Sequence, residues 1–204
     1  MNMLSKTVGY ISSIPGRLKG MKFGKNSYIA PGYDWFNVDL KGVVIGNNVV
    51  IGRNAWIQTI GKIDPVNDIK RKKPGQFNTN IKTESADTGG KIIIGDNTQI
   101  GRYTNISAVR KITIGTNCLI AYNVTIADHD HHFTAKKTPM ESGVGTPKEI
   151  TIGDECFIGA HSFILKGVRL GKHCVVGANS VVTKSFSPNS VLAGNPARLI
   201  RKLK

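Results

Sequence analysis

The sequence predicts an all-β protein built as a parallel β-helix, and three regularities of the sequence support this fold class. Nine glycines each directly follow an aliphatic residue: Ile45-Gly46, Ile51-Gly52, Ile94-Gly95, Ile100-Gly101, Ile114-Gly115, Ile152-Gly153, Ile158-Gly159, Leu170-Gly171 and Val176-Gly177. Further aliphatic residues keep the same spacing of six, or a multiple of six, outside a few interruptions: Ile57, Ile106, Ile120, Ile126, Ile164 and Val182. Four residues after these aliphatic positions, the residue is small or β-branched, as at Val49, Ala55, Thr98, Thr104, Cys118, Val124, Cys156, Ser162, Val168, Cys174 and Ser180.

A period of six matches neither the 3.6 residues of a helix nor the alternation of a single strand, but a short strand followed by a corner. Three such repeats close one coil of about eighteen residues, and the coils stack at roughly 4.8 Å. The chain of 204 residues has room for about six coils. We expect the aliphatic residue to point inward, and the glycine to stand where the backbone turns or passes close to a neighbour.

The repeat sets the domain boundaries. It extends to Phe23 and Ile29, so residues 23–195 form one β-helix domain after a basic N-terminal segment, residues 1–22. That segment lacks the continuous apolar stretch of a signal peptide or membrane span. Excursion loops are expected near 64–90 and over 127–149, with a two-residue bulge between Ile106 and Ile114. Because Pro196 is tolerated in a first helical turn, a short capping helix is predicted over 196–204.

The three cysteines all occupy the small inward position of their repeats, at Cys118, Cys156 and Cys174. Ser, Thr and Val fill the same position elsewhere, so we expect buried, reduced thiols that fill space. An odd number of cysteines without a signal sequence fits a reducing compartment and predicts neither a disulfide framework nor a nucleophile.

The net charge of +15 points to an anionic partner. Nucleic acid, an anionic membrane surface and an anionic small molecule would each fit a basic excess. Aromatic residues are sparse and no recognition motif accompanies the charge, so no nucleic-acid partner is expected. A coenzyme with several phosphates would use some of the charge, and an anionic acceptor or membrane face would use more.

Three of the five histidines, His129, His131 and His132, lie together in the loop after Ile126. Three interpretations are open from the residues alone: a metal site, a solvated loop, or a general base for acyl transfer. The other two, His161 and His173, follow their repeat aliphatic residues by three positions and are expected on the surface.

Three C-terminal stretches identify a family resemblance: residues 150–171 (ITIGDECFIGAHSFILKGVRLG), 175–184 (VVGANSVVTK) and 193–201 (AGNPARLIR). They resemble the hexapeptide-repeat acyltransferases, most closely the galactoside and maltose O-acetyltransferases and the polysaccharide-biosynthesis O-acetyltransferases. The resemblance covers roughly residues 23–204. It implies a left-handed β-helix, a homotrimer, and acetyl-CoA as co-substrate. It further implies direct transfer to a sugar hydroxyl in surface polysaccharide, capsule or lipopolysaccharide biosynthesis, without a metal. The expected location is the cytoplasm, with the inner face of the membrane as a further site of association.

The resemblance also implies particular site residues. The family's loop base follows the coil that ends here in Asn123-Val-Thr-Ile126, and the match falls on His129. Its coenzyme contacts fall on Ala160, Ala178, Thr183, Lys184, Arg198 and Arg201. Acceptor contacts are expected at Ser107, Asp128, Asp130 and His131. Asp128, Asp130, Glu149 or a backbone carbonyl would orient His129.

Two departures from the family pattern favour its polysaccharide branch. Ser107 stands where galactoside-acting members have an Asn-x-Asn run, and the long helical cap of the maltose enzymes is missing, so the chain should enter the coil almost directly at Phe23. Alternatives from other classes are a γ-type carbonic anhydrase-like metalloenzyme and a non-enzymatic scaffold. An antibiotic acetyltransferase would use a similar loop histidine.

Overall fold

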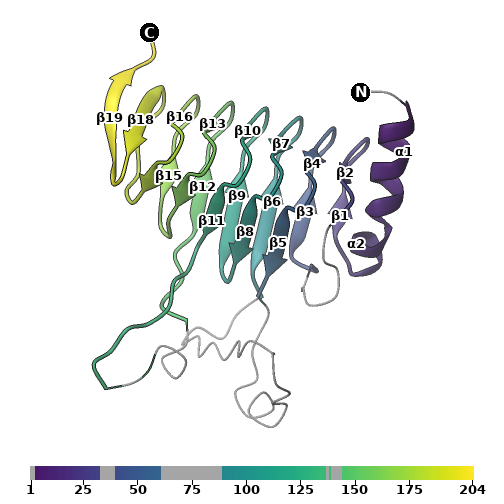
Figure 1. The fold of residues 1–204 in the computed structure, drawn as a ribbon, viewed down its shortest axis with the longest axis horizontal. Helices are drawn as coiled ribbons and strands as arrows, with labels where there is room; N and C mark the ends of the chain where they lie inside the picture. The colour runs from purple at the N-terminus through teal and green to yellow at the C-terminus, as the bar shows by residue number, and fades with distance from the viewer. Residues whose placement is uncertain (1–2, 33–39, 61–88, 137, 139–143) are drawn as a thin grey trace.

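The computed structural model describes residues 3–32, 40–60, 89–136, 138 and 144–204. Short parallel strands wind into a triangular prism, and the chain advances by one layer per turn (Figure 1). The predicted fold class, a left-handed parallel β-helix, is confirmed. The polar loop expected near 64–90 lies almost entirely outside the described residues.

Three sheets form the faces of the prism. The first stacks, in order, β1 Lys22–Phe23, β3 Val43–Ile45, β6 Lys91–Ile94, β9 Lys111–Ile114, β12 Ile150–Ile152 and β15 Arg169–Leu170. The second stacks β2 Tyr28–Ile29, β4 Val50–Ile51, β7 Gln99–Ile100, β10 Leu119–Ile120, β13 Phe157–Ile158, β16 Val175–Val176, β18 Ser190–Gly194 and β19 Ala197–Lys202. The third stacks β5 Trp56–Thr59, β8 Asn105–Ala108, β11 Thr125–Ala127, β14 Phe163–Ile164 and β17 Val181–Val182.

The core is a set of aliphatic ladders inside the prism. Ile94 pairs with Ile114, which pairs with Ile152 on the next coil, and all three side chains are buried. The small inward positions are buried as predicted, including the three cysteines, which are free. The repeated glycine is explained by close approach of the coils. A Cβ on Gly95 would lie 2.6 Å from the carbonyl carbon of Gly115, inside the van der Waals limit.

A left-handed turn residue marks many of the corners. The third residue after a repeat aliphatic has φ near +57°, for example Asn97 (φ 58°), Asn117 (φ 55°) and Asn179 (φ 57°). Asn tolerates this conformation better than most residues with a side chain, which explains its recurrence there. His161 and His173 occupy equivalent positions and are exposed, as expected.

The two ends of the prism differ from the expectation. Two short helices, α1 Met3–Ser12 and α2 Ile14–Leu18, precede the first coil, where no helix is predicted. At the other end, the predicted capping helix over 196–204 is wrong. The chain reverses after Gly194 and forms β19, which pairs antiparallel with β18, so the C-terminal cap satisfies the edge of a sheet instead of closing the end with a helix. Among the described residues, no helix has the length and apolar character needed to cross a membrane.

Candidate active site

Asp128 holds the side chain of His129. The distance from His129 Nδ1 to Asp128 Oδ1 is 3.0 Å, and the imidazole is 14% exposed while the carboxylate is fully buried. Because a carboxylate only accepts hydrogen bonds, Nδ1 is the protonated nitrogen when the imidazole is neutral. Nε2 then keeps its lone pair, as a general base requires.

The same carboxylate stabilises the predicted bulge between β8 and β9. It accepts hydrogen bonds from the backbone N–H groups of Val109, Arg110 and Lys111, at 2.8, 2.7 and 2.7 Å. A bulge leaves backbone donors without partners in the ladder, and Asp128 supplies those partners from the next coil. A fully buried carboxylate with these contacts is not accessible to an acceptor within this chain, which differs from the acceptor contact expected for Asp128.

Hydrogen bonds and an ion pair hold together the base of the loop that carries His129. Lys148 N donates to Asp128 O at 2.8 Å, and Gly145 N donates to Asp130 O at 2.7 Å. The Asp130 carboxylate pairs with Lys166 Nζ at 2.6 Å. His131 is exposed and forms an antiparallel bridge with Val144. His129 therefore stands at the root of the excursion, close to the prism, and Asp130 and His131 follow it along the loop.

Ser107 lies one coil before this root. It pairs with Ala127, and its carbonyl accepts from Asp128 N at 3.4 Å. Its hydroxyl accepts a hydrogen bond from Gln58 Nε2 at 2.9 Å, and the residue is buried.

The corner between the second and third sheets presents two columns of side chains. The first column is Arg53, Arg102, Tyr122, Ala160 and Ala178, and the second is Asn54, Tyr103, Asn123, His161 and Asn179. Backbone bonds link them from coil to coil: Tyr103 N to Arg53 O at 3.1 Å, Asn123 N to Arg102 O at 2.8 Å, His161 N to Tyr122 O at 3.2 Å and Asn179 N to Ala160 O at 2.9 Å. Ala160 and Ala178 thus continue a column that contains Tyr122 and Arg102.

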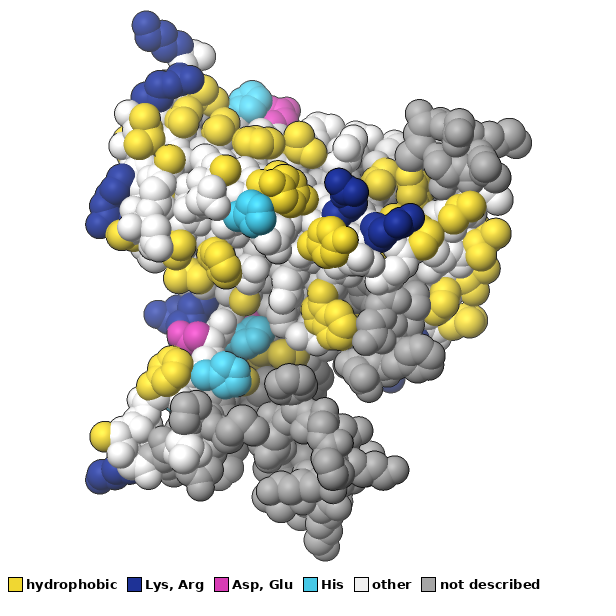
Figure 2. All heavy atoms as spheres, in the orientation of Figure 1, with side chains coloured by type: hydrophobic (Ala, Val, Ile, Leu, Met, Phe, Trp, Pro, Cys, Tyr) yellow, Lys and Arg dark blue, Asp and Glu magenta, His cyan; other side chains and the backbone are white. Residues whose placement is uncertain are grey.

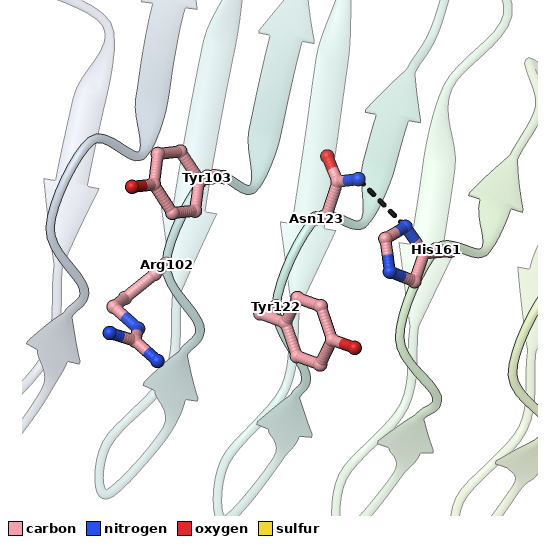
Figure 3. Close-up of a pocket in the computed structure, with 5 residues that line it drawn as sticks. All are labelled: Arg102, Tyr103, Tyr122, Asn123 and His161. Atoms are coloured by element: carbon pink, nitrogen blue, oxygen red, sulfur yellow. Dashed lines mark hydrogen bonds between the residues drawn. The ribbon is translucent and has the colours of Figure 1, made fainter.

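A pocket of about 470 Å³ lies on this corner, lined by Arg102, Tyr103, Tyr122, Asn123 and His161. Figure 3 shows these side chains projecting from adjacent coils. Asn123 Nδ2 donates to His161 Nδ1 at 2.7 Å, and the rings of Tyr122 and His161 meet edge to face at 4.9 Å. This pocket was not predicted from the sequence. The shared turn position of Tyr103, Asn123 and His161 was the signal that could have indicated it.

The remaining predicted coenzyme residues lie towards the C-terminal end. Thr183 and Lys184 follow β17, and Arg198 and Arg201 lie on β19; all four are exposed. Figure 2 shows Lys and Arg side chains, in dark blue, at the end of the prism that carries β19. No ion pair joins Lys184, Arg198 or Arg201 to a carboxylate of the described residues.

His129 and the pocket belong to different corners of the prism. Asn123 lies before strand β11 and Asp128 lies after it, at the two ends of one strand of the third sheet. In Figure 1 the loop that follows β11 leaves the prism at its lower edge. The imidazole therefore follows the C-terminal end of β11, whereas Ala160 and Ala178 precede the N-terminal ends of β14 and β17, which stack in the same sheet. Among the described residues, no group of three His, Cys, Asp or Glu side chains is arranged to hold a metal ion.

Comparison with known sequences finds acyltransferases among the similar proteins. A family model described as the hexapeptide repeat of succinyl-transferase matches residues 149–184. The chain is 45% identical over 125 residues to a candidate acetyltransferase of Dictyostelium discoideum (59% of this chain, 63% of that one). It is 38% identical over 120 residues to WbbJ of Escherichia coli K12, a candidate lipopolysaccharide biosynthesis O-acetyl transferase (55% and 61%). It is 41% identical over 118 residues to galactoside O-acetyltransferase of the same strain (53% and 56%). The chain thus spans about three fifths of the length of these relatives.

Comparison with solved structures also finds acyltransferases. A galactoside acetyltransferase in complex with coenzyme A is 39% identical, with a TM-score of 0.52 over 55% of this chain and 56% of that one. A variant of AntD, an N-acyltransferase from Bacillus cereus, has a TM-score of 0.67 over 92% of this chain and 88% of that one; at 22% identity it supports the fold alone. These findings confirm the resemblance to the hexapeptide-repeat acyltransferases. Within them, the similar proteins include sugar and polysaccharide O-acetyltransferases.

Proposed function

We propose that this protein is an acetyl-CoA-dependent O-acetyltransferase that transfers the acetyl group directly to a sugar hydroxyl in the biosynthesis of a surface polysaccharide, capsule or lipopolysaccharide. The observation that carries the proposal is the Asp128–His129 pair. It presents one imidazole with a fixed tautomer at the base of a loop that backbone hydrogen bonds hold in place. The relatives named as sugar and lipopolysaccharide O-acetyltransferases support the substrate class.

In this mechanism His129 Nε2 accepts the proton of the acceptor hydroxyl while that oxygen attacks the thioester carbonyl. Collapse of the tetrahedral intermediate breaks the carbon–sulfur bond, and the same imidazole returns the proton to the departing thiolate. General base catalysis of this kind contributes roughly 10²–10⁴-fold. Asp128 is a positioning residue in this scheme, since its carboxylate touches His129 and the backbone but no substrate.

The coenzyme runs along the corner column towards the C-terminal end. Ala178 and Ala160 leave space for the pantetheine arm, and the exposed cations of Lys184, Arg198 and Arg201 neutralise the phosphates. The column leads directly to Tyr122 and the pocket, so the thioester and the acceptor meet there. Tyr103 and Tyr122 offer aromatic faces for a sugar ring, and Arg102 offers a cation for an anionic acceptor.

The site is completed by a second subunit of a homotrimer. His129 and the corner column lie on different edges of one prism, and a threefold arrangement of prisms brings the loop of one subunit to the column of its neighbour. We place the enzyme in the cytoplasm, near the anionic inner face of the membrane, in keeping with its net charge of +15.

The test is acetyl transfer to a panel of free, nucleotide-linked and lipid-linked sugars, followed by substitution of the loop histidines. His129→Ala should lower kcat at least about 100-fold with only a small loss of melting temperature, because the loop lies outside the repeat core and the imidazole makes one hydrogen bond to the buried Asp128 carboxylate. His132→Ala is the matched control on the same loop and should keep most of the activity, and His131→Ala should cost much less than His129→Ala. A His129→Ala enzyme with more than about a tenth of the wild-type kcat would remove the mechanism.

A further inference from the structure

The N-terminal helices pack on the prism through their smallest residues. Gly9 of α1, Ser13 at the junction of the two helices and Gly16 of α2 are all buried. A Cβ on Gly9 would clash with the ring of Tyr28. Ser13 Oγ donates to Gly9 O and accepts from Ile29 N, at 2.8 and 2.7 Å, so it ties the helix to the first coil. The face turned towards the prism has no room for large side chains.

The opposite face is apolar and exposed. It contains Val8, Tyr10, Ile11, Ile14 and Leu18, which we call the docking face. Ile11 is 60% exposed and Leu18 84%. Figure 2 shows hydrophobic side chains, in yellow, along the end of the molecule where Figure 1 places α1 and α2. A helix on a protein core normally buries its large apolar residues. Here they point away from the core, which marks a surface that binds something else.

The N-terminal segment that carries the docking face has charges of one sign in its sequence. Residues 1–32 contain five cations (Lys6, Arg17, Lys19, Lys22 and Lys25) and no Asp or Glu. The Arg17 guanidinium lies over the rings of Tyr10 and Phe23, at 5.0 and 4.4 Å, and its Nε is buried without a hydrogen-bond partner in the described structure. A cation is thus fixed beside Tyr10, at the margin of the docking face.

We propose that the docking face binds the surface of an anionic phospholipid bilayer. Large apolar residues beside lysines and arginines are what a helix lying in the membrane interface requires, because the former enter the acyl boundary and the latter meet lipid phosphates. A second copy of this chain is a poor occupant. Two docking faces brought together would oppose the cationic segments of the two copies, which carry like charges.

The docking face lies at the end of the prism opposite β19, beyond the first coil (Figure 1). Occupation by lipid would therefore leave the corner column and the loop of His129 open to solvent. The inference does not depend on the proposed acetyl transfer and would stand if that failed.

The test is co-sedimentation of the purified protein with vesicles of phosphatidylcholine alone and with about 30 mol% phosphatidylglycerol. The wild type should bind the anionic vesicles and release on addition of salt. Ile11→Glu and Leu18→Glu should each lower partitioning at least about tenfold, because each removes an apolar anchor and adds a repelled charge. Both side chains are exposed, so the melting temperature should not change.

The matched control is Ile200→Glu, which alters an isoleucine of similar exposure, 62%, at the other end of the prism. It makes the same change in net charge and should bind anionic vesicles like the wild type. Three results would overturn the proposal: no binding of the wild type to anionic vesicles, unchanged binding of both helix variants, or an equal loss in all three variants. Self-association that Ile11→Glu abolishes, without vesicle binding, would assign the face to a second copy instead.

Discussion

Replacement of Asp128 by alanine would remove one carboxylate that holds both a backbone bulge and an imidazole. Three backbone N–H groups would lose their acceptor, and that of Val109 lies in a buried position. A buried donor that loses a charged partner costs about 1.5–3 kcal/mol, and each partly exposed donor less, because water replaces the partner. The expected loss is about 3–6 kcal/mol, or on the order of 10–20 °C in melting temperature for a chain of this size.

Asp128→Asn separates the two roles of the carboxylate. The amide keeps one oxygen for the backbone donors, so the loss of stability should be smaller, about 1–3 kcal/mol. Its NH₂ group can donate to His129 Nδ1, which would move the imidazole proton to Nε2 and abolish the base. We expect kcat to fall by roughly 10²–10⁴, close to the effect of His129→Ala.

Thermal unfolding followed by circular dichroism and initial rates of acetyl transfer measure the two effects separately. Asp130→Asn is the matched control on the same loop, because Asp130 is half exposed and pairs with Lys166 at the surface. It should cost less than about 1 kcal/mol. If Asp128→Ala melts with the wild type, the carboxylate does not hold the bulge. If Asp128→Asn keeps full activity while His129→Ala is inactive, Asp128 does not set the tautomer.

Three other outcomes are expected. Lys184→Ala and Arg201→Ala should raise KM for acetyl-CoA several-fold with little change in kcat, since phosphate contacts bind ground and transition states alike, and an unchanged KM would place the coenzyme elsewhere. Hydrogen bonds from the Thr116 backbone and hydroxyl lower the pKa of Asp154. The ionised carboxylate therefore stabilises the fold above the ordinary carboxyl pKa, and this stabilisation is lost as pH falls below about 4. In Asp154→Asn the melting temperature should depend less on pH in that range. Light scattering should find a trimer at micromolar concentration, and a monomer would contradict the assembly.

Most of the fold could be predicted from the hexapeptide repeat, because each aliphatic residue of the repeat has the same environment in every coil. Ile94, Ile114 and Ile152 stack on each other, so the inward orientation predicted for one of them is supported by the same prediction for the equivalent residues of the neighbouring coils. The ends lack this redundancy. At the C-terminus Pro196 fits a helix start, yet the chain pairs its last strand with β18, and local propensity does not report an open sheet edge next to it. At the N-terminus no helix was predicted, and the structure has α1 and α2 there with several large apolar side chains exposed.

The candidate site residues were named from the sequence only through the resemblance to known acyltransferases. From the sequence, Asp128 was one of several groups expected to orient His129, and it was also expected to contact the acceptor. The positioning role of Asp128 becomes visible through its hydrogen bond to Val109 in the bulge. Val109 becomes a neighbour of Asp128 only when two coils stack. The pocket was missed for a similar reason. Arg102, Tyr122 and His161 lie in separate repeats, and only the stacking of coils brings them together.

Mixing two inactive variants tests whether the imidazole and the corner column of one site come from different subunits. His129→Ala removes the base but leaves its own column intact, and Ala160→Trp fills the column but leaves its own His129 in place. If each site joins the loop of one subunit to the column of another, random trimers of the two variants contain intact sites. Equal mixing should restore about a quarter of the wild-type activity, because both halves of a site must come from the right chain. The variants must be refolded or co-expressed together, since assembled trimers need not exchange. If each chain used its own histidine and its own column, every site would keep one defect, and the mixture would stay as inactive as its components.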